Sequence, residues 1–349
     1  MTATYAHVVE PDTLTVDHEE VAAPPAGRVV VRVRYVGVCG TDVHGFQAPE
    51  FLPPAVFGHE WTGTVTAVGE GVSTIQVGQR VVASVGPACG RCAYCRAGQT
   101  DQCELVYQEA NGIDPDAPAH GAFATEVVVS ERRVQPLLDG LTDEQAGLVE
   151  PTTVTFHAVR RAGQRLGAVV VVQGAGPIGL LTAQHARHAG ARTVIVVEPN
   201  AARRATATAL GFDAVFAPGD DFRAHLQRVS DGLGADVLYE CTGAPTLFQA
   251  SAELVRRGGT LALLGYPMTT SEVSYGDWQS RQLTVIGSLA YTHEDFVGAM
   301  AAIASGAVDV DVLHTATVGL DGLEAVLRDL GSGTSKETKV LVDPTLGRS

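Results

Sequence analysis

Continuous apolar runs separated by helical stretches mark the middle of this 349-residue chain. The runs AVVVVQ (168–173) and TVIVV (193–197) are typical of strands buried on both faces of a parallel sheet. Further αβ units follow, with ADVLYE (235–240), a helix over 245–256, GGTLALLG (258–265) and LTVIG (283–287). This alternation begins near residue 154 and fades near residue 290. It predicts a doubly wound parallel sheet of about six strands.

Three glycines stand between the first two of these strands in the spacing GxGxxG, at Gly174, Gly176 and Gly179. Such glycines allow a tight turn, close approach of the backbone to a pyrophosphate, and close packing of helix against strand. A helix closed by Gly190 follows, and the acid Glu198 ends the next strand, where a dinucleotide-binding fold places one. Because strand, turn, helix, strand and acid agree, the pattern predicts dinucleotide binding rather than an ordinary glycine turn.

Glu198 also bears on the choice of cofactor. A carboxylate at this place hydrogen-bonds the adenosine ribose hydroxyls and repels a 2′-phosphate, which favours NAD over NADP. Arg203 and Arg204 follow; they can meet a phosphate, lie on a solvated helix face, or provide one guanidinium to stack on adenine. We expect cofactor contacts, besides the three glycines and Glu198, at Pro177, Ile178, Arg203, Thr242, Leu264 and Ser288.

Four of the six cysteines lie within fifteen residues, at Cys89, Cys92, Cys95 and Cys103. Four thiolates around one ion, at ~2.3 Å, form a tetrahedral structural zinc site with no open position. Disulfides are disfavoured because cysteines so close in sequence strain such bonds, and the spacing matches neither ferredoxin pattern. The motif therefore predicts a structural zinc that orders a lobe and performs no catalysis.

Composition excludes several classes of partner. The net charge of −15, from 24 basic and 39 acidic residues, argues against nucleic-acid and anionic-membrane partners. No apolar run approaches the ~20 residues that span a bilayer, and the first residues do not resemble a secretory signal. We therefore expect a cytoplasmic location. Lys336 and Lys339 are the only lysines, so lysine-based chemistry has few candidates.

The first third of the chain carries polar residues that suit a second metal. They stand in CGTDVH (39–44) and GHEWTG (58–63). Cys39 and His59 are good zinc ligands, and Asp42 and Glu60 can bind the metal or hydrogen-bond one of its ligands. A third acid, Glu150, precedes a proline that disfavours the α conformation, so we expect the next helix to begin after it. Taken singly, each residue can equally be an ordinary core or turn residue.

Together these motifs are specific. CGTDVH, GHEWTG, the cysteine motif, EPTTVTFHA and GAGPIG occur in the order and at the separations found in zinc-dependent medium-chain alcohol and polyol dehydrogenases, which the chain resembles over nearly its whole length. The resemblance implies a β-rich, GroES-like catalytic domain over 1–153, a Rossmann domain over 154–290, and a return to the catalytic domain over 291–349. It also implies a homodimer or homotetramer, built by edge-to-edge pairing of Rossmann sheets through LTVIGSLAYT.

The resemblance implies a role for each candidate residue. Cys39 and His59 match catalytic zinc ligands, and Glu150 stands where a second cysteine is found in alcohol dehydrogenases, as in the sorbitol, butanediol and threonine dehydrogenase branch. Glu60 can also bind the metal in that branch, so both carboxylates stay candidates. Asp42 resembles the residue that orients the zinc-bound histidine. Thr41 and His44 match a proton relay.

The implied reaction is hydride transfer from an alcohol carbon to NAD, with zinc as Lewis acid on the alcohol oxygen. No lysine or arginine occurs between Arg34 and Arg80, so the loops of the first domain offer no cation to a carboxylate substrate. We therefore expect a neutral secondary alcohol, diol or polyol. Threonine- or aminocyclitol-type substrates are the alternative, and a non-catalytic zinc- and nucleotide-binding sensor is a further one that zinc stoichiometry would distinguish.

Overall fold

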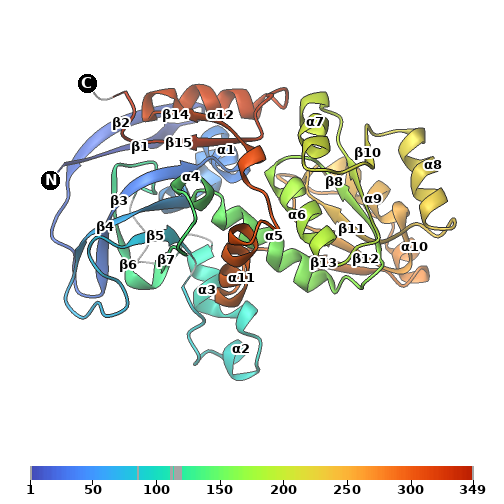
Figure 1. The fold of residues 1–349 in the computed structure, drawn as a ribbon, viewed down its shortest axis with the longest axis horizontal. Helices are drawn as coiled ribbons and strands as arrows, with labels where there is room; N and C mark the ends of the chain where they lie inside the picture. The colour runs from blue at the N-terminus through green and yellow to red at the C-terminus, as the bar shows by residue number, and fades with distance from the viewer. Residues whose placement is uncertain (1, 85, 111–112, 114–119, 348–349) are drawn as a thin grey trace. The chain divides into compact units, whose positions relative to one another are not determined.

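The computed structural model describes residues 2–84, 86–110, 113 and 120–347, and it divides the chain into two compact units (Figure 1). The first unit takes its residues from Met1–Glu150, Ala290–Ala304 and His314–Ser349. The second takes them from Pro151–Leu289 and Ser305–Leu313. The first unit therefore combines segments that lie far apart in the sequence.

The first unit consists mainly of β-strands. Strands β1 (Thr2–Glu10) and β2 (Thr13–Glu20) form an antiparallel hairpin. A larger, seven-stranded sheet has the order β14-β15-β3-β4-β5-β7, and β6 also pairs with β3. Its strands are β3 (Arg28–Gly37), β4 (Glu60–Val68), β5 (Arg80–Ala83), β6 (Glu126–Ser130), β7 (Val134–Pro136), β14 (His314–Val318) and β15 (Lys339–Val342).

The central strand β3 shows why this sheet forms. Its sequence RVVVRVRYVG places Val29, Val31 and Val33 in the core while Arg32 stays exposed, and Phe46 and Phe123 complete the same cluster. The returning strand β15 pairs antiparallel with β3. The helices of this unit are α1 (Gly40–Gln47), α2 (Ala93–Arg96), α3 (Glu104–Ala110), α4 (Asp143–Ala146), α11 (His293–Ala304) and α12 (Leu323–Gly331).

The second unit is a doubly wound fold. Its six strands are all parallel, in the order β10-β9-β8-β11-β12-β13, which confirms the predicted sheet of six strands. The strand β8 (VVVVQ) is buried at every position, as a central parallel strand should be. The strands are β8 (Val169–Gln173), β9 (Thr193–Val197), β10 (Val215–Phe216), β11 (Ala235–Glu240), β12 (Val255–Leu263) and β13 (Thr284–Gly287).

Two predicted helix boundaries were wrong. The helix α5 (Val149–Ala162) begins before Pro151 and contains Glu150, because a proline in the first turn removes only an amide that the helix would leave unbonded. The helix predicted to reach residue 256 is α9 (Phe248–Leu254), since Val255 already belongs to a strand. The other helices of the second unit are α6 (Pro177–His188), α7 (Ala201–Ala209), α8 (Asp220–Val229) and α10 (Tyr275–Ser280).

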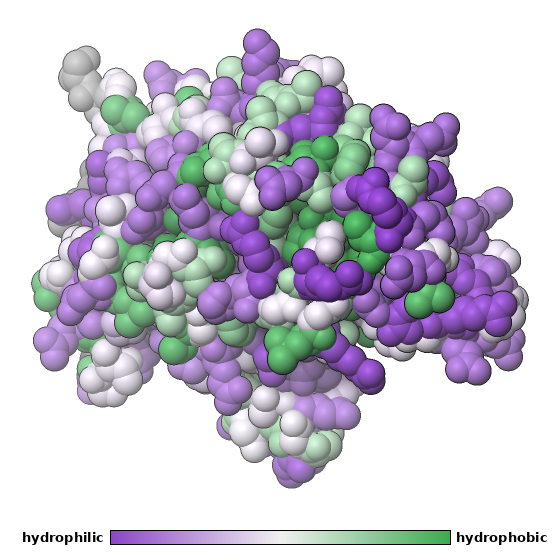
Figure 2. Space-filling view, turned by 45° about the vertical axis from the view of Figure 1, so that its right-hand side comes forward, coloured by the Kyte–Doolittle hydropathy of each residue, from purple (hydrophilic) through white to green (hydrophobic). Residues whose placement is uncertain are grey.

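The face in Figure 2 shows a mixture of hydrophilic and hydrophobic residues. Over the whole surface, Leu166 and Leu233 are among the exposed large apolar side chains. Single exposed apolar side chains are normal on globular domains. Among the described residues, no helix combines the length and the apolar character needed to cross a membrane.

Candidate metal and cofactor sites

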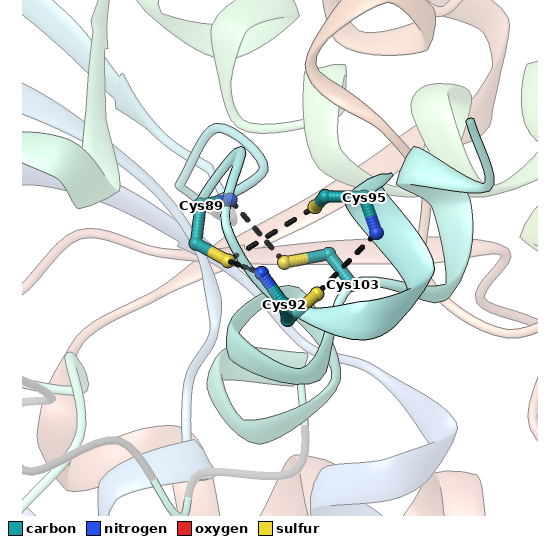
Figure 3. A group of neighbouring side chains, drawn as sticks. All are labelled: Cys89, Cys92, Cys95 and Cys103. Atoms are coloured by element: carbon teal, nitrogen blue, oxygen red, sulfur yellow. Dashed lines mark hydrogen bonds between the residues drawn. The ribbon is translucent and has the colours of Figure 1, made fainter. Parts of the chain in front are cut away.

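The four clustered cysteines converge on one point. One ligand sulfur from each of Cys89, Cys92, Cys95 and Cys103 lies within 4.8 Å of the others. Cys92 precedes the short helix α2 and Cys103 immediately precedes α3, so two local turns deliver the thiols (Figure 3). All four are free thiols rather than disulfides. The predicted cysteine cluster is thus brought together as four potential ligands for one ion.

The backbone around this cluster favours thiolates. Backbone amides of Cys92 and Cys95 donate to the sulfurs of Cys89 and Cys92, at 3.3 and 3.5 Å, and the amide of Cys89 donates to Cys103 Sγ at 3.3 Å. The amide of Cys95, with that of Glu104, lowers the pKa of Cys92 to about 6, whereas burial raises the pKa of Cys95 to about 12. Four converging sulfurs that accept backbone amides are the donor set of a closed Zn²⁺ site, in which the ion itself favours the thiolate form.

Replacing Cys92 with serine should destabilise the protein more than it alters intrinsic chemistry, because loss of one ligand weakens a site whose binding free energy supports folding. We expect a lower midpoint of thermal unfolding and loss of one zinc per chain by metal analysis, with the KM for an alcohol substrate nearly unchanged. A stable variant that retains wild-type unfolding while lacking one zinc would contradict a structural role.

A second group of potential ligands lies in the first unit. Sulfur of Cys39, a ring nitrogen of His59 and a carboxylate oxygen of Glu60 all lie within 4.8 Å of one another. Cys39 immediately precedes helix α1, and Glu60 begins strand β4 with His59 just before it. Glu60 is 1% exposed, whereas Cys39 and His59 are half-buried. A thiol, an imidazole and a carboxylate at this separation form a set that suits zinc.

The ring of His59 is oriented by a backbone carbonyl. Its Nδ1 lies 3.0 Å from the oxygen of Val56, which leaves Nε2 for a metal, whereas Asp42 Oδ1 is 3.7 Å away. Asp42 thus contacts the ring as a weak ion pair, and its role in orienting His59 stays a prediction. Both oxygens of the fully buried Asp42 also accept backbone amides, from Cys39 and Gly58 at 2.8 Å each. Asp42 fixes the backbone on which both candidate ligands stand.

Glu150 is not one of the three groups that lie within 4.8 Å of one another. Burial raises its pKa to about 7, while a hydrogen bond from Tyr291 works in the opposite direction. Tyr291, 3% exposed, is a residue that sequence reasoning missed. It belongs to the segment by which the chain re-enters the first unit after residue 289.

Lys339 is a second residue missed from the sequence. Its ammonium group, 1% exposed, pairs with the carboxylate of Glu60 and donates to the carbonyl of Val38 at 2.8 Å. It reaches Glu60 across Gly37, where a Cβ would lie 2.3 Å from Glu60 Oε2 and 2.9 Å from Lys339 Cε. The one available signal was a lysine opening the apolar strand KVLV.

The surroundings of His59 favour a cation. Burial alone would lower its pKa, but the neighbouring Cys39, Asp42 and Glu150 outweigh that effect and raise the pKa well above its usual value. The negative groups that raise this pKa would also attract a divalent ion, which binds the neutral form of the ring. Thr41 and His44 lie three residues apart on α1, both half-buried, and burial lowers the pKa of His44.

The glycine loop in the second unit has the geometry that its spacing predicts. Gly174 has φ of +94°, and a Cβ on Gly179 would lie 1.9 Å from the carbonyl oxygen of Gly174, so neither position accommodates a side chain. Gly176 caps helix α6 and faces open space, while Pro177 takes the first helical position and Ile178 the next. The amino end of this helix is suited to phosphate.

Some of the residues expected to contact the cofactor already have hydrogen-bond partners within the protein, and others do not. Glu198, 4% exposed, accepts the amides of Ala175 and Asn200 at 2.7 and 2.8 Å, which ties it to the glycine loop. Arg204 donates to the carbonyls of Glu198 and Pro199. Within the described chain, Arg203 Nε and Ser288 Oγ are among eight buried side-chain atoms without a hydrogen-bond partner, so they are free to make a further contact. Leu264 instead donates its backbone amide to the carbonyl of Glu240.

The chain is similar to known proteins over most of its length. A family model described as an alcohol dehydrogenase GroES-like domain matches residues 25–139, and one described as a zinc-binding dehydrogenase matches residues 177–305. A 2-dehydro-3-deoxy-L-galactonate 5-dehydrogenase of Pseudoalteromonas atlantica is 33% identical over 92% of this chain and 93% of its own length. A sorbitol dehydrogenase of Halalkalibacterium halodurans is 29% identical over 92% and 93%. The structure of 2R,3R-butanediol dehydrogenase from Bacillus subtilis is 28% identical, covers 98% of this chain and 100% of its own, and superposes with a TM-score of 0.83.

Proposed function

Because the chain belongs to the zinc-dependent medium-chain alcohol and polyol dehydrogenase family, we propose that it oxidises a neutral secondary alcohol, diol or polyol reversibly to a ketone, with NAD as acceptor. The observation that carries this proposal is the convergence of Cys39, His59 and Glu60 within 4.8 Å. The metal cluster belongs to the first unit and the glycine loop to the second.

We assign two zinc ions to each chain, one in the four-cysteine cluster and one at Cys39 and His59 with a carboxylate. When bound, the second zinc supplies a Lewis acid for the alcohol oxygen, and NAD supplies the hydride acceptor. A carboxylate oxygen of Glu60, unlike those of Glu150, lies within 4.8 Å of both other ligand atoms, which favours Glu60 as the resting carboxylate ligand. Glu150 is then the second carboxylate, held by Tyr291.

The chain's own side chains position these groups and move the proton. Asp42 fixes the backbone of Cys39 and Gly58, and Val56 fixes the ring of His59. In the proposed relay, the hydroxyl of Thr41 takes up the proton of the alcohol as it gives up its own, and His44 releases a proton to water. The lowered pKa of His44 favours that release, because a neutral imidazole is restored near neutral pH.

NAD is favoured over NADP by the acid at the end of β9. A 2′-phosphate next to the nearly buried carboxylate of Glu198 would meet like charge in a poorly solvated setting. Arg204, the neighbouring cation, already donates to two backbone carbonyls. Arg203 is left to contact the adenosine end of the cofactor.

The proposed substrate is neutral, although the relatives named above act on an aldonate derivative as well as on sorbitol and butanediol. The basic group at the metal cluster, Lys339, is already paired with Glu60. A substrate carboxylate would therefore have to compete with an internal acid for it. We place sugar acids, threonine-type and aminocyclitol substrates behind neutral polyols for this reason.

A substrate screen on a metal-analysed sample tests the proposal. Diols, polyols, sugar acids and threonine are each incubated with NAD or NADP, and the absorbance of the reduced nicotinamide is followed. We expect turnover of a neutral polyol or diol, a kcat/KM at least tenfold higher with NAD than with NADP, and two zinc ions per chain. A sample with two zinc ions that turns over no alcohol would refute the proposal, and one zinc ion per chain would support a non-catalytic sensor.

We also propose a homo-oligomer, dimer or tetramer, in the cytoplasm. The edge strand β13 supports pairing, because Val285 on it and Leu289 just after it are exposed, whereas inner strands are buried. The six free cysteines support a reducing compartment.

A further inference from the structure

The carboxylate of Glu240 is an unusual feature of the second unit. It ends strand β11 and is 0% exposed. Its oxygens accept the backbone amides of Thr242 and Gly243, at 2.8 and 3.1 Å, together with the hydroxyl of Thr242. A buried carboxylate is costly unless its hydrogen bonds are well made, and here three donors of one turn provide them.

The turn that Glu240 holds is packed from two sides. A Cβ on Gly174 would lie 3.0 Å from the methyl group of Thr242, so this threonine rests against the glycine loop. On the other side, a Cβ on Gly265 would lie 2.0 Å from the amide nitrogen of Gly243. The turn therefore has little freedom to shift as long as Glu240 keeps its three bonds.

The same turn borders a cavity at the carboxyl ends of the parallel strands. The cavity has a volume of about 120 Å³, and its lining includes Gln173, Gly174, Val197, Phe222 and Thr242. Open α/β sheets bind ligands at this edge. A displacement of Thr242 would thus change the wall of the crevice that the glycine loop also forms.

The hydroxyl of Thr242 makes two hydrogen bonds inside the chain. It donates to Glu240 and accepts the amide of Ala244 at 3.0 Å. The group of Thr242 that faces the glycine loop is the methyl, and the expected cofactor contact of this residue stays a prediction. The influence of Thr242 on a bound dinucleotide then depends on where Glu240 holds it.

We propose that Glu240 is a positioning residue, whose buried carboxylate fixes the Thr242–Gly243 turn against the glycine loop and thereby sets the affinity for the dinucleotide. This inference rests on the proposed function, since it concerns the same cofactor. Glutamine at position 240 would place an amide NH₂ group against a backbone N–H, leaving one donor of the turn unsatisfied.

The test is direct binding of NAD to the zinc-loaded protein, followed by protein fluorescence, together with steady-state kinetics and thermal unfolding. For Glu240→Gln we expect the Kd and the KM for NAD to rise about tenfold or more, with kcat at saturating NAD within about threefold of wild type. The matched control is Asp236→Asn at the opposite end of β11, where the carboxylate accepts the amide of Val169 at 2.8 Å and pairs with Arg256. This control should lower the unfolding midpoint while leaving the Kd for NAD within about twofold.

A pair of variants keeps the inference testable if Glu240→Gln does not fold. Thr242→Val removes the hydroxyl bonded to Glu240 and should weaken NAD binding, whereas Thr242→Ser retains that hydroxyl and should bind more tightly than the valine variant. Equal affinities for these two, an unchanged Kd in Glu240→Gln, or an equal loss in Asp236→Asn would overturn the positioning role. Wild-type protein that binds neither NAD nor NADP would instead overturn the proposed function and this inference together.

Discussion

Replacing Cys39 with alanine will reduce turnover by about a thousandfold or more, while NAD binding survives. The thiolate is one of the few ligands of the candidate catalytic metal, and its loss removes the Lewis acid that makes the alcohol reactive. A thousandfold change corresponds to about 4 kcal/mol of transition-state stabilisation, within what a metal supplies. The measurements are kcat/KM for the substrate found in the screen, zinc content, and the Kd for NAD.

The fold around position 39 should tolerate the change. Asp42 bonds the backbone amide of residue 39 rather than its side chain, so the start of helix α1 stays fixed in the variant. The cysteine cluster provides a matched contrast, because Cys92→Ser loses the other zinc and is expected to affect stability. If Cys39→Ala kept two zinc ions and wild-type turnover, the cluster at Cys39, His59 and Glu60 would not be the catalytic site.

A site can be predicted from the sequence when its residues lie close together along the chain. The four cysteines and the glycine loop are local motifs, so spacing alone predicted that the thiols would converge and that the glycines would allow a tight turn, in which Gly174 has a positive φ. The candidate catalytic cluster joins residues from separate segments, and its recognition needed the resemblance to a family as well as the spacing. The fold class followed from periodicity, because buried parallel strands such as β8 show continuous apolar runs.

The residues that the sequence did not reveal act through tertiary contacts. Lys339 and Glu60 are separated by 279 positions, and they meet because strands β15 and β4 flank the same end of β3. Neither residue type nor periodicity indicates such a pair. The wrong prediction that the helix begins after Glu150 has a different origin. The residue before a proline disfavours the α conformation, but in the first turn of a helix this preference is overridden, because a proline there breaks no backbone hydrogen bond.

Replacing Lys339 with methionine will destabilise the protein by about 3–5 kcal/mol, which is the usual cost of removing one partner from a buried ion pair. The carboxylate of Glu60 would be left in a site where it is 1% exposed, and the carbonyl of Val38 would lose its donor. Methionine preserves most of the volume of the lysine stem, so the loss measures charge and hydrogen bonding rather than packing. Denaturant unfolding, after a chelator has removed the ion at Cys39 and His59, gives the free energy of unfolding, because a zinc bound to Glu60 would itself compensate the carboxylate.

A double-mutant cycle separates the ion pair from general damage to the strand. In Lys339→Met combined with Glu60→Gln, the uncompensated charge is gone, so the double variant should be more stable than Lys339→Met alone. Lys336→Met is the matched control, because Lys336 is exposed and its replacement should change the free energy of unfolding by less than about 0.5 kcal/mol. If the effects of Lys339→Met and Glu60→Gln simply add, the two charges are not coupled, and Lys339 does not hold Glu60 beside Cys39 and His59.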